Sequence, residues 1–331
     1  MNRRRFLVLS TVGMVLAGAV VAGLALYSTY VVRASIPDFP EALGYLPADC
    51  QAVFGMNVRK FIASPVYARF EARQGAKLGS DLAEFEAKTG VDPRRDISYI
   101  IAGGKSSAER KGRGAIVAVG RFNSAAIISY VSTRTTPVRA DYKNTPVYML
   151  PDKSGNSVDK GLAFLKETEI ALGDLDSLKA ILDVRAGSAP GIAQNEVLAP
   201  LLNELNADEM FWFAGDTATI LSRAPADTPL GPSLSAVQNI VGTLNLTEAI
   251  SGKVVATARD EEAARRLTDV VRGLVALGEL AGEKNPLLVE LVRGISVTQD
   301  RTQIRLVINL PMEVLDKLEQ AKPFRRLTND N

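Results

Sequence analysis

The stretch "GAIVAVGRFNSAAIISYV", Gly114–Val131, decides the fold class. It starts with a glycine, continues as a short apolar run typical of a buried strand, and passes through an arginine into an amphipathic helix. The same succession returns in "GKVVATARDEEAARRLTDVV", Gly252–Val271. A strand-and-helix unit that occurs twice in one chain predicts an internal repeat.

Two further pairs of segments support the repeat. "LPADCQAVFGMN" from Leu46 aligns with "LNADEMFWFAGD" from Leu205, and each has Leu-x-Ala-Asp before an apolar strand. "TEIALGDLDSLKAIL" from Thr168 aligns with "TQIRLVINLPMEVLDKL" from Thr302, where a strand leads into a closing helix. The three pairs follow one another in the same order, so we expect two related halves.

Strands and helices mix within each half without regular βαβ alternation, and several strands are joined by tight turns. This predicts an α+β fold in which antiparallel strands pack on helices. We place the first half at residues 46–204, the second half at 205–322 and a polar tail at 323–331. Asn57 and Asp216 follow the first strand of each half at a position that suits a helix N-cap.

The longest amphipathic helix in the second half is predicted over Asp260–Gly282. Acidic residues in its first turn suit the positive end of the helix dipole. Its apolar side chains form one stripe, which we expect to be buried: Leu267, Val270, Val271, Leu274, Leu277 and Leu280.

The N-terminal region predicts a membrane anchor. Phe6–Val32 is an uncharged run of 27 residues, and about 20 apolar residues suffice to cross a bilayer as a helix. Three arginines precede the run and only Arg33 follows it, so the positive-inside rule keeps the N-terminus in the cytoplasm. We expect cytoplasmic arginines and a transmembrane helix over residues 1–33, a linker over 34–45, and a periplasmic or extracellular body.

Two features of the anchor leave alternatives open. The sequence "RRRFL" from Arg3 resembles a twin-arginine export signal, which would carry a folded body across the membrane. The run is long for a signal peptide and has no convincing small-x-small cleavage site before Ile36, which favours an uncleaved anchor. Small residues four apart form either a face for a partner helix or the usual Gly and Ala content of a membrane helix. They are Gly13 and Ala17, Gly18 and Ala22, and Ala19 and Gly23.

The composition excludes several classes of chemistry. With no histidine and only one cysteine, Cys50, the chain cannot form an internal disulfide, a multi-cysteine metal site or a histidine-based triad. The formal charge of +2 comes from the arginines around the apolar run, because the chain after Arg33 holds 35 basic and 37 acidic residues. The positive net charge of the whole chain is therefore no argument for nucleic-acid binding.

The segment from Tyr99 to Gly120 contains Gly-Gly-Lys-Ser, which is how a phosphate-binding loop ends. Tyr99 occupies the position of the required first glycine and no helix follows the serine, so we expect a hairpin loop and no nucleotide site. The basic side chains of this loop are either simply solvated or contact an anionic lipid headgroup or an acidic partner. They are Lys105, Arg110, Lys111 and Arg113.

Two motifs resemble enzyme signatures without their context. Ser157-x-x-Lys160 fits a motif of penicillin-recognising enzymes, but the companion motifs stand in the wrong order. Asp174-x-Asp176 follows a strand as in haloacid-dehalogenase-type phosphatases, but no acidic metal-binding motif follows it. We expect Asp174 to cap the next helix instead.

Aromatic side chains are densest at Phe211–Phe213. Successive strand residues point to opposite faces, so Trp212 should oppose its two neighbours. Trp212 is predicted to lie in the core, with a ligand pocket as the alternative.

The anchor and the repeat together resemble a group of uncharacterised single-pass bacterial envelope proteins, of the domain-of-unknown-function type. The resemblance begins near "LPAD…VFGMNV" and covers most of the chain after Leu46. It implies an inner-membrane address and a duplicated α+β exterior region, and it supplies no catalytic residue. We predict a non-enzymatic, membrane-anchored binding or scaffold module without cofactor or metal. The alternatives are an accessory subunit of a membrane complex, held by its transmembrane helix, and a hydrolase that uses carboxylates alone.

Overall fold

The computed structural model describes residues 40–105, 113–151, 159–217, 234–280, 286–314 and 317. Contacts group the chain into two compact units, which we call the first unit (Val32–Ile220) and the second unit (from Leu221 onward). The predicted anchor, most of the linker and the polar tail lie outside the described residues. No helix in the described ranges is both long and apolar enough to cross a bilayer.

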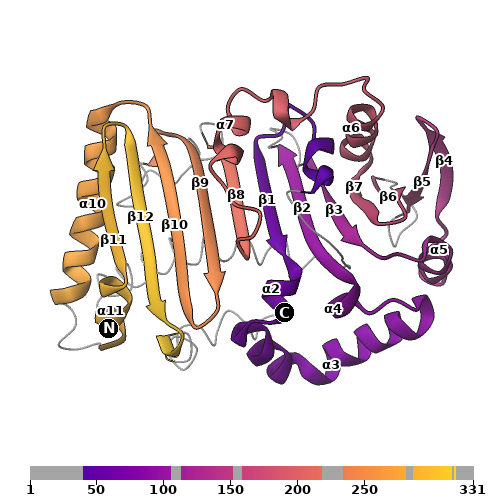
Figure 1. Cartoon of the computed structure of the whole chain (residues 1–331), viewed down its shortest axis with the longest axis horizontal. Coiled ribbons are helices and arrows are strands. Elements are labelled where there is room, and N and C mark those ends of the chain that lie inside the picture. The colour runs from indigo at the N-terminus through magenta and orange to yellow at the C-terminus, as the bar shows by residue number, and fades with distance from the viewer. Residues whose placement is uncertain are drawn as a thin grey trace. The chain divides into compact units, whose positions relative to one another are not determined.

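The first unit is built on an antiparallel sheet whose strands follow the order β8–β1–β2–β3–β7–β6–β5–β4 (Figure 1). The strands are β1 (Ala52–Asn57), β2 (Ile97–Lys105), β3 (Arg113–Gly120), β4 (Val138–Tyr142), β5 (Thr145–Leu150), β6 (Lys160–Lys166), β7 (Glu169–Asp174) and β8 (Phe211–Asp216). The central strands are nearly continuous apolar runs because both of their faces are buried.

Helices connect these strands. They are η1 (Glu41–Tyr45), α2 (Val58–Ile62), α3 (Pro65–Thr89), α4 (Pro93–Asp96), α5 (Ser124–Ser132), α6 (Leu175–Arg185), η2 (Ile192–Gln194) and α7 (Leu198–Asn203). Asn57 caps α2 as predicted, since its side chain accepts a hydrogen bond from the Lys60 N–H at 3.1 Å. Gly90 ends α3 with φ 69°, a left-handed conformation that favours glycine.

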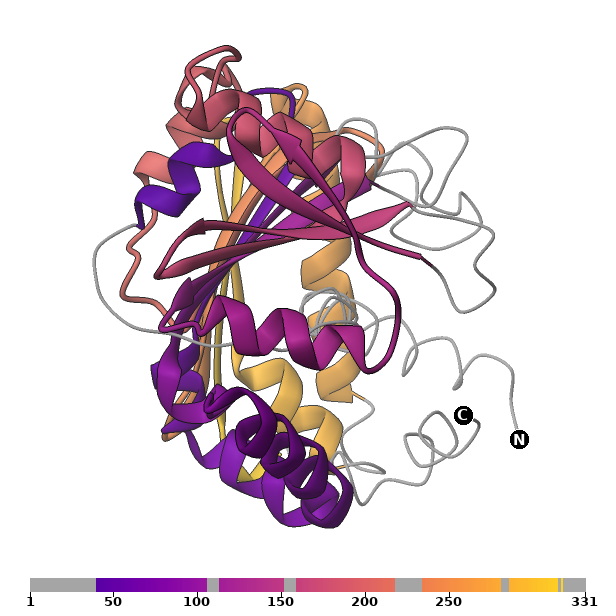
Figure 2. The same cartoon turned by 90° about the vertical axis from the view of Figure 1, so that its right-hand side faces the viewer.

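The two faces of this sheet have different covers (Figure 2). On one face Met56 packs with α2, and Ala118 and Ile170 pack with α5. On the other face α6 contacts β3, β6 and β7, η1 packs beside α6, and residues of the sheet such as Ile101 and Ala171 are fully buried. This second face, which we call the α6 face, carries the candidate site described below.

The second unit has a smaller antiparallel sheet in the order β11–β12–β10–β9. Its elements are β9 (Val237–Leu246), β10 (Ala249–Ala258), α10 (Glu261–Leu280), α11 (Pro286–Arg293), β11 (Ile295–Asp300) and β12 (Gln303–Pro311). The buried stripe of α10 packs on Ala258 and Ile304 through Ala263, Ala264 and Leu267.

The predicted stripe of α10 is wrong at its C-terminal end. Leu277 and Leu280 are 50% and 78% exposed. This end of the helix contacts α11 through Gly278, because a Cβ at Gly278 would lie 2.4 Å from Val292 Cγ1. The two helices therefore approach each other closely at Gly278, which has no Cβ, and the two leucines lie outside this contact.

The two units share a strand order. Strands β2–β3–β7–β6 of the first unit and β9–β10–β12–β11 of the second have the same spatial order, each with a helix after the second strand in the chain, and the first unit has the additional strands β4 and β5 between that helix and β6. Within the first unit, β1 pairs with β8 so that Phe54 lies opposite Phe213. These two residues occupy the same position in the aligned segments that begin at Leu46 and Leu205.

Candidate functional site

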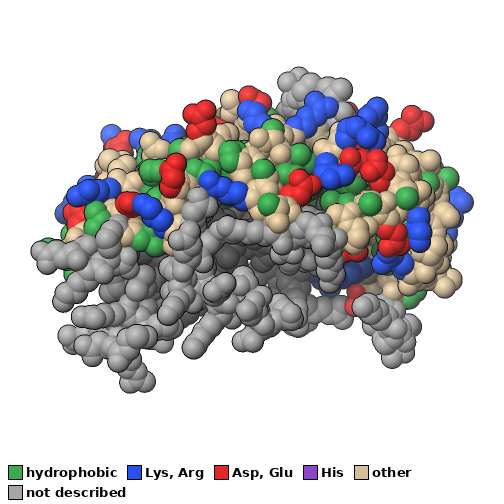
Figure 3. Space-filling model, turned by 90° about the horizontal axis from the view of Figure 1, so that it is seen from below, with side chains coloured by type: hydrophobic (Ala, Val, Ile, Leu, Met, Phe, Trp, Pro, Cys, Tyr) green, Lys and Arg blue, Asp and Glu red, His purple; other side chains and the backbone are tan. Residues whose placement is uncertain are grey.

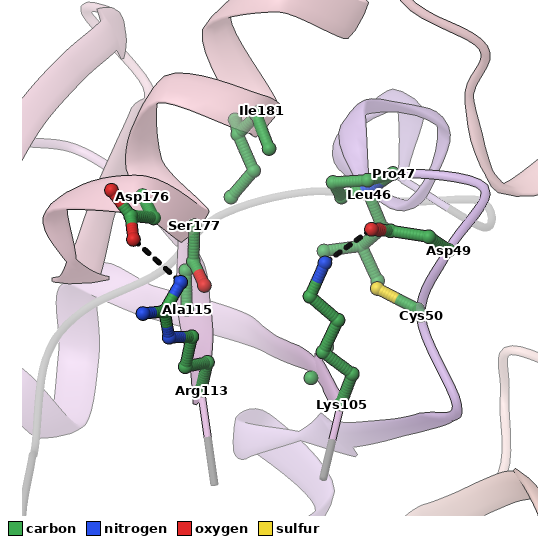
Figure 4. A pocket seen from close by; sticks show the side chains of 13 residues that line it. Leu46, Pro47, Asp49, Cys50, Lys105, Arg113, Ala115, Asp176, Ser177 and Ile181 are labelled. Carbon is green, nitrogen blue, oxygen red and sulfur yellow. Dashed lines mark hydrogen bonds and ion pairs between the residues drawn. The ribbon is translucent and has the colours of Figure 1, made fainter. Parts of the chain in front are cut away.

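A small cleft opens on the α6 face where the β2–β3 hairpin begins (Figure 4). Its volume is about 60 Å³, which is room for a few water molecules. Its lining comes from the segment after η1, from the facing ends of β2 and β3, and from the start of α6: Leu46, Pro47, Asp49, Cys50, Gly103, Gly104, Lys105, Arg113, Ala115, Asp176, Ser177, Ala180 and Ile181.

Two ion pairs frame the cleft. Lys105 and Arg113 lie opposite each other on β2 and β3. Lys105 pairs with Asp49, and Arg113 Nη1 lies 2.6 Å from Asp176 Oδ2. Both carboxylates are more than half exposed, at 61% and 65%, so water screens the pairs and each stabilises the fold by less than about 1 kcal/mol.

The predicted basic loop is therefore only partly available to an anion. Of its four cations, the two that the structure describes each have a carboxylate partner. Arg110 and Lys111 lie outside the described residues. In the view of Figure 3, Lys and Arg side chains are interspersed with Asp and Glu over the described surface.

Asp174 joins α6 to the sheet. Its Oδ1 accepts a hydrogen bond from the Ser177 N–H at 2.9 Å, which confirms the predicted N-cap. Its Oδ2 accepts from the Gly114 N–H at 2.7 Å and from Ser177 Oγ at 2.8 Å. Both carboxylate oxygens are occupied by hydrogen bonds that hold β3 and α6 together, so Asp174 does not present a free nucleophile.

Cys50 lies at the inner wall of the cleft and is buried. Burial is the main cause that raises the pKa of the thiol to about 12, and the neighbouring Asp49 carboxylate raises it further. A thiol with this pKa is protonated at neutral pH and is a poor nucleophile. The close fit depends on Gly103, where a Cβ would lie 2.8 Å from Leu46 and 3.2 Å from Cys50 Sγ.

Trp212 lies in the core rather than in the cleft. Its side chain is fully buried, and its indole N–H donates a hydrogen bond to the hydroxyl of Tyr99. The Tyr99 hydroxyl in turn donates to the Ala207 carbonyl at 3.0 Å. Trp212 opposes Phe211 and Phe213 as expected, since only the tryptophan is buried. The predicted core position of Trp212 is confirmed, and the described residues give no support to the alternative of a ligand pocket.

A second polar cluster, which sequence reasoning missed, lies between η1 and the β6–β7 turn. Tyr45 donates to Glu41 Oε1 at 2.7 Å, and Lys166 Nζ donates to Glu41 Oε2 at 2.5 Å. Glu169 Oε2 lies 3.8 Å from Lys166 and has no hydrogen-bond partner, although the residue is only 4% exposed. Burial raises the pKa of Glu169. The one sequence signal was the Lys166–Glu169 spacing, which is common in exposed turns.

The described residues contain no group of three or more acidic or cysteine side chains arranged to hold a metal ion. Around the cleft, the charged groups pair with one another and Asp174 holds the backbone. This arrangement provides hydrogen-bonding and charged groups at a surface, but it does not combine a reactive group with an activating base.

No family model and no curated protein matches the chain. Among solved structures, crystal form III of TP0453 is similar with a TM-score of 0.49 and 9% identity, over 86% of this chain and 98% of that one. Crystal form I of TP0453 is similar with a TM-score of 0.47 and 9% identity, over 86% and 96% of the two chains.

Proposed function

We propose that this chain is a membrane-anchored binding or scaffold module whose α+β body lies outside the cytoplasmic membrane. The observation that carries the proposal is the state of the polar groups around the cleft. Asp174 is held by three hydrogen bonds, the Cys50 thiol has a raised pKa, and Lys105 pairs with a carboxylate. Side chains that are already held by hydrogen bonds or ion pairs suit a binding surface better than a catalytic site, which needs a free reactive group.

The anchor belongs to the same proposal. It rests on the uncharged run Phe6–Val32 and the three arginines before it, which the sequence provides. The body joins this run through residues 34–45, so we infer a short distance between the membrane and η1.

A duplication of the body is also proposed. Three aligned sequence pairs support it, as does the shared order of four strands in the two units. The β1–β8 register adds an independent argument. A two-fold axis between the two aligned segments requires one residue of the antiparallel pair to face its own copy and its neighbours to pair reciprocally, and Phe54 opposite Phe213, with Val53 opposite Ala214 and Gly55 opposite Trp212, fits that condition.

An accessory subunit of a membrane complex is the second candidate, and the small-residue spacing in the anchor favours it. Purification in mild detergent tests it: a stoichiometric partner that is lost in the Gly18→Leu/Gly23→Leu variant supports the subunit. A carboxylate-based hydrolase has little support, because Asp174 caps α6 and Asp176 pairs with Arg113.

The side of the membrane on which the body lies can be tested by cysteine labelling, in which the native Cys50 sets the background signal. Cys50 is buried, so a membrane-impermeant maleimide should label the unmodified chain weakly. Ser188 is exposed, and the Ser188→Cys variant should be labelled in intact spheroplasts. Labelling that appears only after lysis would contradict the extracytoplasmic address.

A further inference from the structure

Strand β11 forms an edge of the second unit's sheet. Within the described ranges its one strand partner is β12, and α10 and α11 also contact it (Figure 1). Its side chains alternate between the exposed positions Ser296, Thr298 and Asp300 and half-buried positions such as Val297, which packs against the core beneath α10. An edge strand presents a row of backbone N–H and C=O groups with which a further strand can pair.

The hydrogen-bond pattern shows which backbone groups of β11 point outward. The Gly294 carbonyl accepts a hydrogen bond from the Asn309 N–H at 2.7 Å, and this pair continues the register of β11 and β12. Hydrogen-bonded and non-hydrogen-bonded pairs alternate in an antiparallel ladder, so the even-numbered residues of β11 share the bonds with β12. The residues whose backbone groups point away from β12 are Ile295, Val297 and Gln299.

The first unit shows what can occupy such an edge. In the shared strand order, β6 stands where β11 stands. The outer edge of β6 is occupied by β5, which pairs with it in antiparallel fashion from Val147 opposite Ala163 to Leu150 opposite Lys160. β5 belongs to the β4–β5 hairpin, and the described residues between α10 and β11 contain no such hairpin. An antiparallel strand therefore fills in the first unit the position that is open beside β11.

The outermost strand of the first unit, β4, carries features that protect an edge. Pro137 precedes it, and its Arg139 and Asp141 form an ion pair at 3.3 Å. Natural proteins use charged side chains and proline to prevent edge strands from pairing. β11 contains no proline, and its one charged residue is Asp300 at the end of the strand. β11 is therefore the less protected of the two edges.

The sequence of β11 suits pairing with a second copy of itself. In an antiparallel pair centred on Val297, each Val297 faces its copy and each Ile295 faces a Gln299, so all the outward-pointing backbone groups of both strands are used. Ser296 then faces Thr298 of the other copy, and such hydroxyl pairs stabilise a sheet. The charged residues at the strand ends lie about 20 Å apart in this pair, at about 3.4 Å per residue, so like charges do not meet.

Apolar surface beside the edge adds to this contact. The C-terminal end of α10 extends past β11 on the outer side of the sheet (Figure 1), and its Leu277 and Leu280 are 50% and 78% exposed. A stable interface has roughly 20–30 residues a side, which is more than one short strand supplies. A second copy at the edge would also cover this helix end. We therefore expect strand and helix contacts to act together in a dimer that dissociates on dilution.

We propose that β11 is a dimerisation edge, which pairs in antiparallel fashion with β11 of a second copy of this chain and has Val297 at the two-fold axis. The proposal goes beyond the proposed function and does not depend on the side of the membrane where the body lies. It is tested on the purified full chain in mild detergent, so its failure is distinct from a failure of the labelling experiment.

Disulfide formation tests the register. Ser296 of one copy and Thr298 of the other form a non-hydrogen-bonded pair with Cα atoms about 4.5 Å apart. Two copies of either residue are diagonal, at about 7–8 Å, which is too far for a disulfide. A mixture of the Ser296→Cys and Thr298→Cys variants, one of them tagged, should form a mixed disulfide dimer under mild oxidation. Either variant alone should form several times less, and the buried Cys50 sets the background.

The mass in solution tests whether the edge holds the dimer. Light scattering over a range of protein concentrations should show a monomer–dimer equilibrium for the wild type. Ser296→Lys/Thr298→Lys places lysines opposite lysines across the axis, and it should raise the dissociation constant about tenfold or more because like charges that face each other oppose association. Val307→Lys/Asn309→Lys is the matched control, since it adds the same charge at exposed positions on β12, one strand further in.

A wild type that stays monomeric and gives no mixed disulfide would overturn the proposal, in favour of a segment of this chain or a strand of another protein at the edge. Equal crosslinking of the mixture and of the single variants would contradict the register and overturn it as well. So would a dimer that tolerates the edge lysines and is lost in Gly18→Leu/Gly23→Leu, since its contact would lie in the anchor. A thermal melt shows whether the lysine variants are folded, and the cysteine mixture decides the outcome if they are not.

Discussion

Glu169 is a buried acid whose ionisation should contribute to the pH dependence of stability. Its carboxyl is buried with one oxygen lacking a hydrogen-bond partner. The groups facing it are Lys166 on β6, Glu41 and Tyr45 on η1, and Arg185 on α6. Burial, which is the largest cause, raises the pKa of Glu169 in the folded state above its ordinary value of 4.5.

The sign of the effect follows from linkage. An acid whose folded pKa is raised contributes stability that is fully present below its unfolded pKa and is lost as the pH rises through the folded pKa. Glu169→Gln should therefore stabilise the protein at neutral pH by about 1 kcal/mol and should change little at pH 4. Melting temperatures measured across this range test it, with the exposed Glu167→Gln as control. A glutamine variant less stable than wild type at pH 7 would refute the prediction.

Gly55 is the residue on which the tryptophan core depends. A Cβ at Gly55 would lie 2.1 Å from Trp212 Cε2, whereas one at Gly44 would meet nothing within 4 Å. Gly55→Ala should cost about 3 kcal/mol of unfolding free energy, and Gly44→Ala should cost less than about 0.5 kcal/mol. Urea denaturation measures both.

A coupling experiment separates this contact from a general strand effect. Trp212→Leu in the Gly55→Ala background should cost less than the sum of the two single substitutions, because the smaller side chain removes the clash. If the two losses of unfolding free energy are additive, the Gly55→Ala substitution does not act through a clash with Trp212.

At the scale of elements, α6 and β3 are joined through Asp174. Asp174→Ala should destabilise the protein by about 2 kcal/mol, since it removes a helix cap and leaves the Gly114 N–H without its partner. Asp174→Ser restores the cap and should recover part of that loss. Asp176→Ala, which removes only the exposed pair with Arg113, should cost less than about 1 kcal/mol. Chemical denaturation checks all three, and equal costs at positions 174 and 176 would contradict this assignment.

Elements whose signals are local could be predicted from the sequence. The caps at Asn57 and Asp174 and the end of α3 at Gly90 depend on residues within a few positions of one another. The cleft could not be predicted in this way, because Lys105 and Asp49 are 56 positions apart and meet only in the fold. The exposed end of α10 was missed for a related reason: periodicity locates a stripe but does not tell which partner covers each turn.

At the scale of the whole molecule, two related halves stay a prediction, and what the structure adds is the strand order β2–β3–β7–β6 in the first unit and β9–β10–β12–β11 in the second. Aligned segments could not show where β8 would pair. The contacts group β8 with the first unit, where it lies beside β1. The aligned segments also could not show that the exposed cations Lys253 and Arg305 share one sheet face, since that depends on the register of β10 and β12.

The facing phenylalanines Phe54 and Phe213 bear on ancestry. An edge that pairs with its own duplicate joins separate subunits as readily as tethered ones. Under the duplication proposed above, a half-length precursor would need only that edge to form a symmetric homodimer, and end-to-end fusion of two copies of its gene would free the halves to diverge.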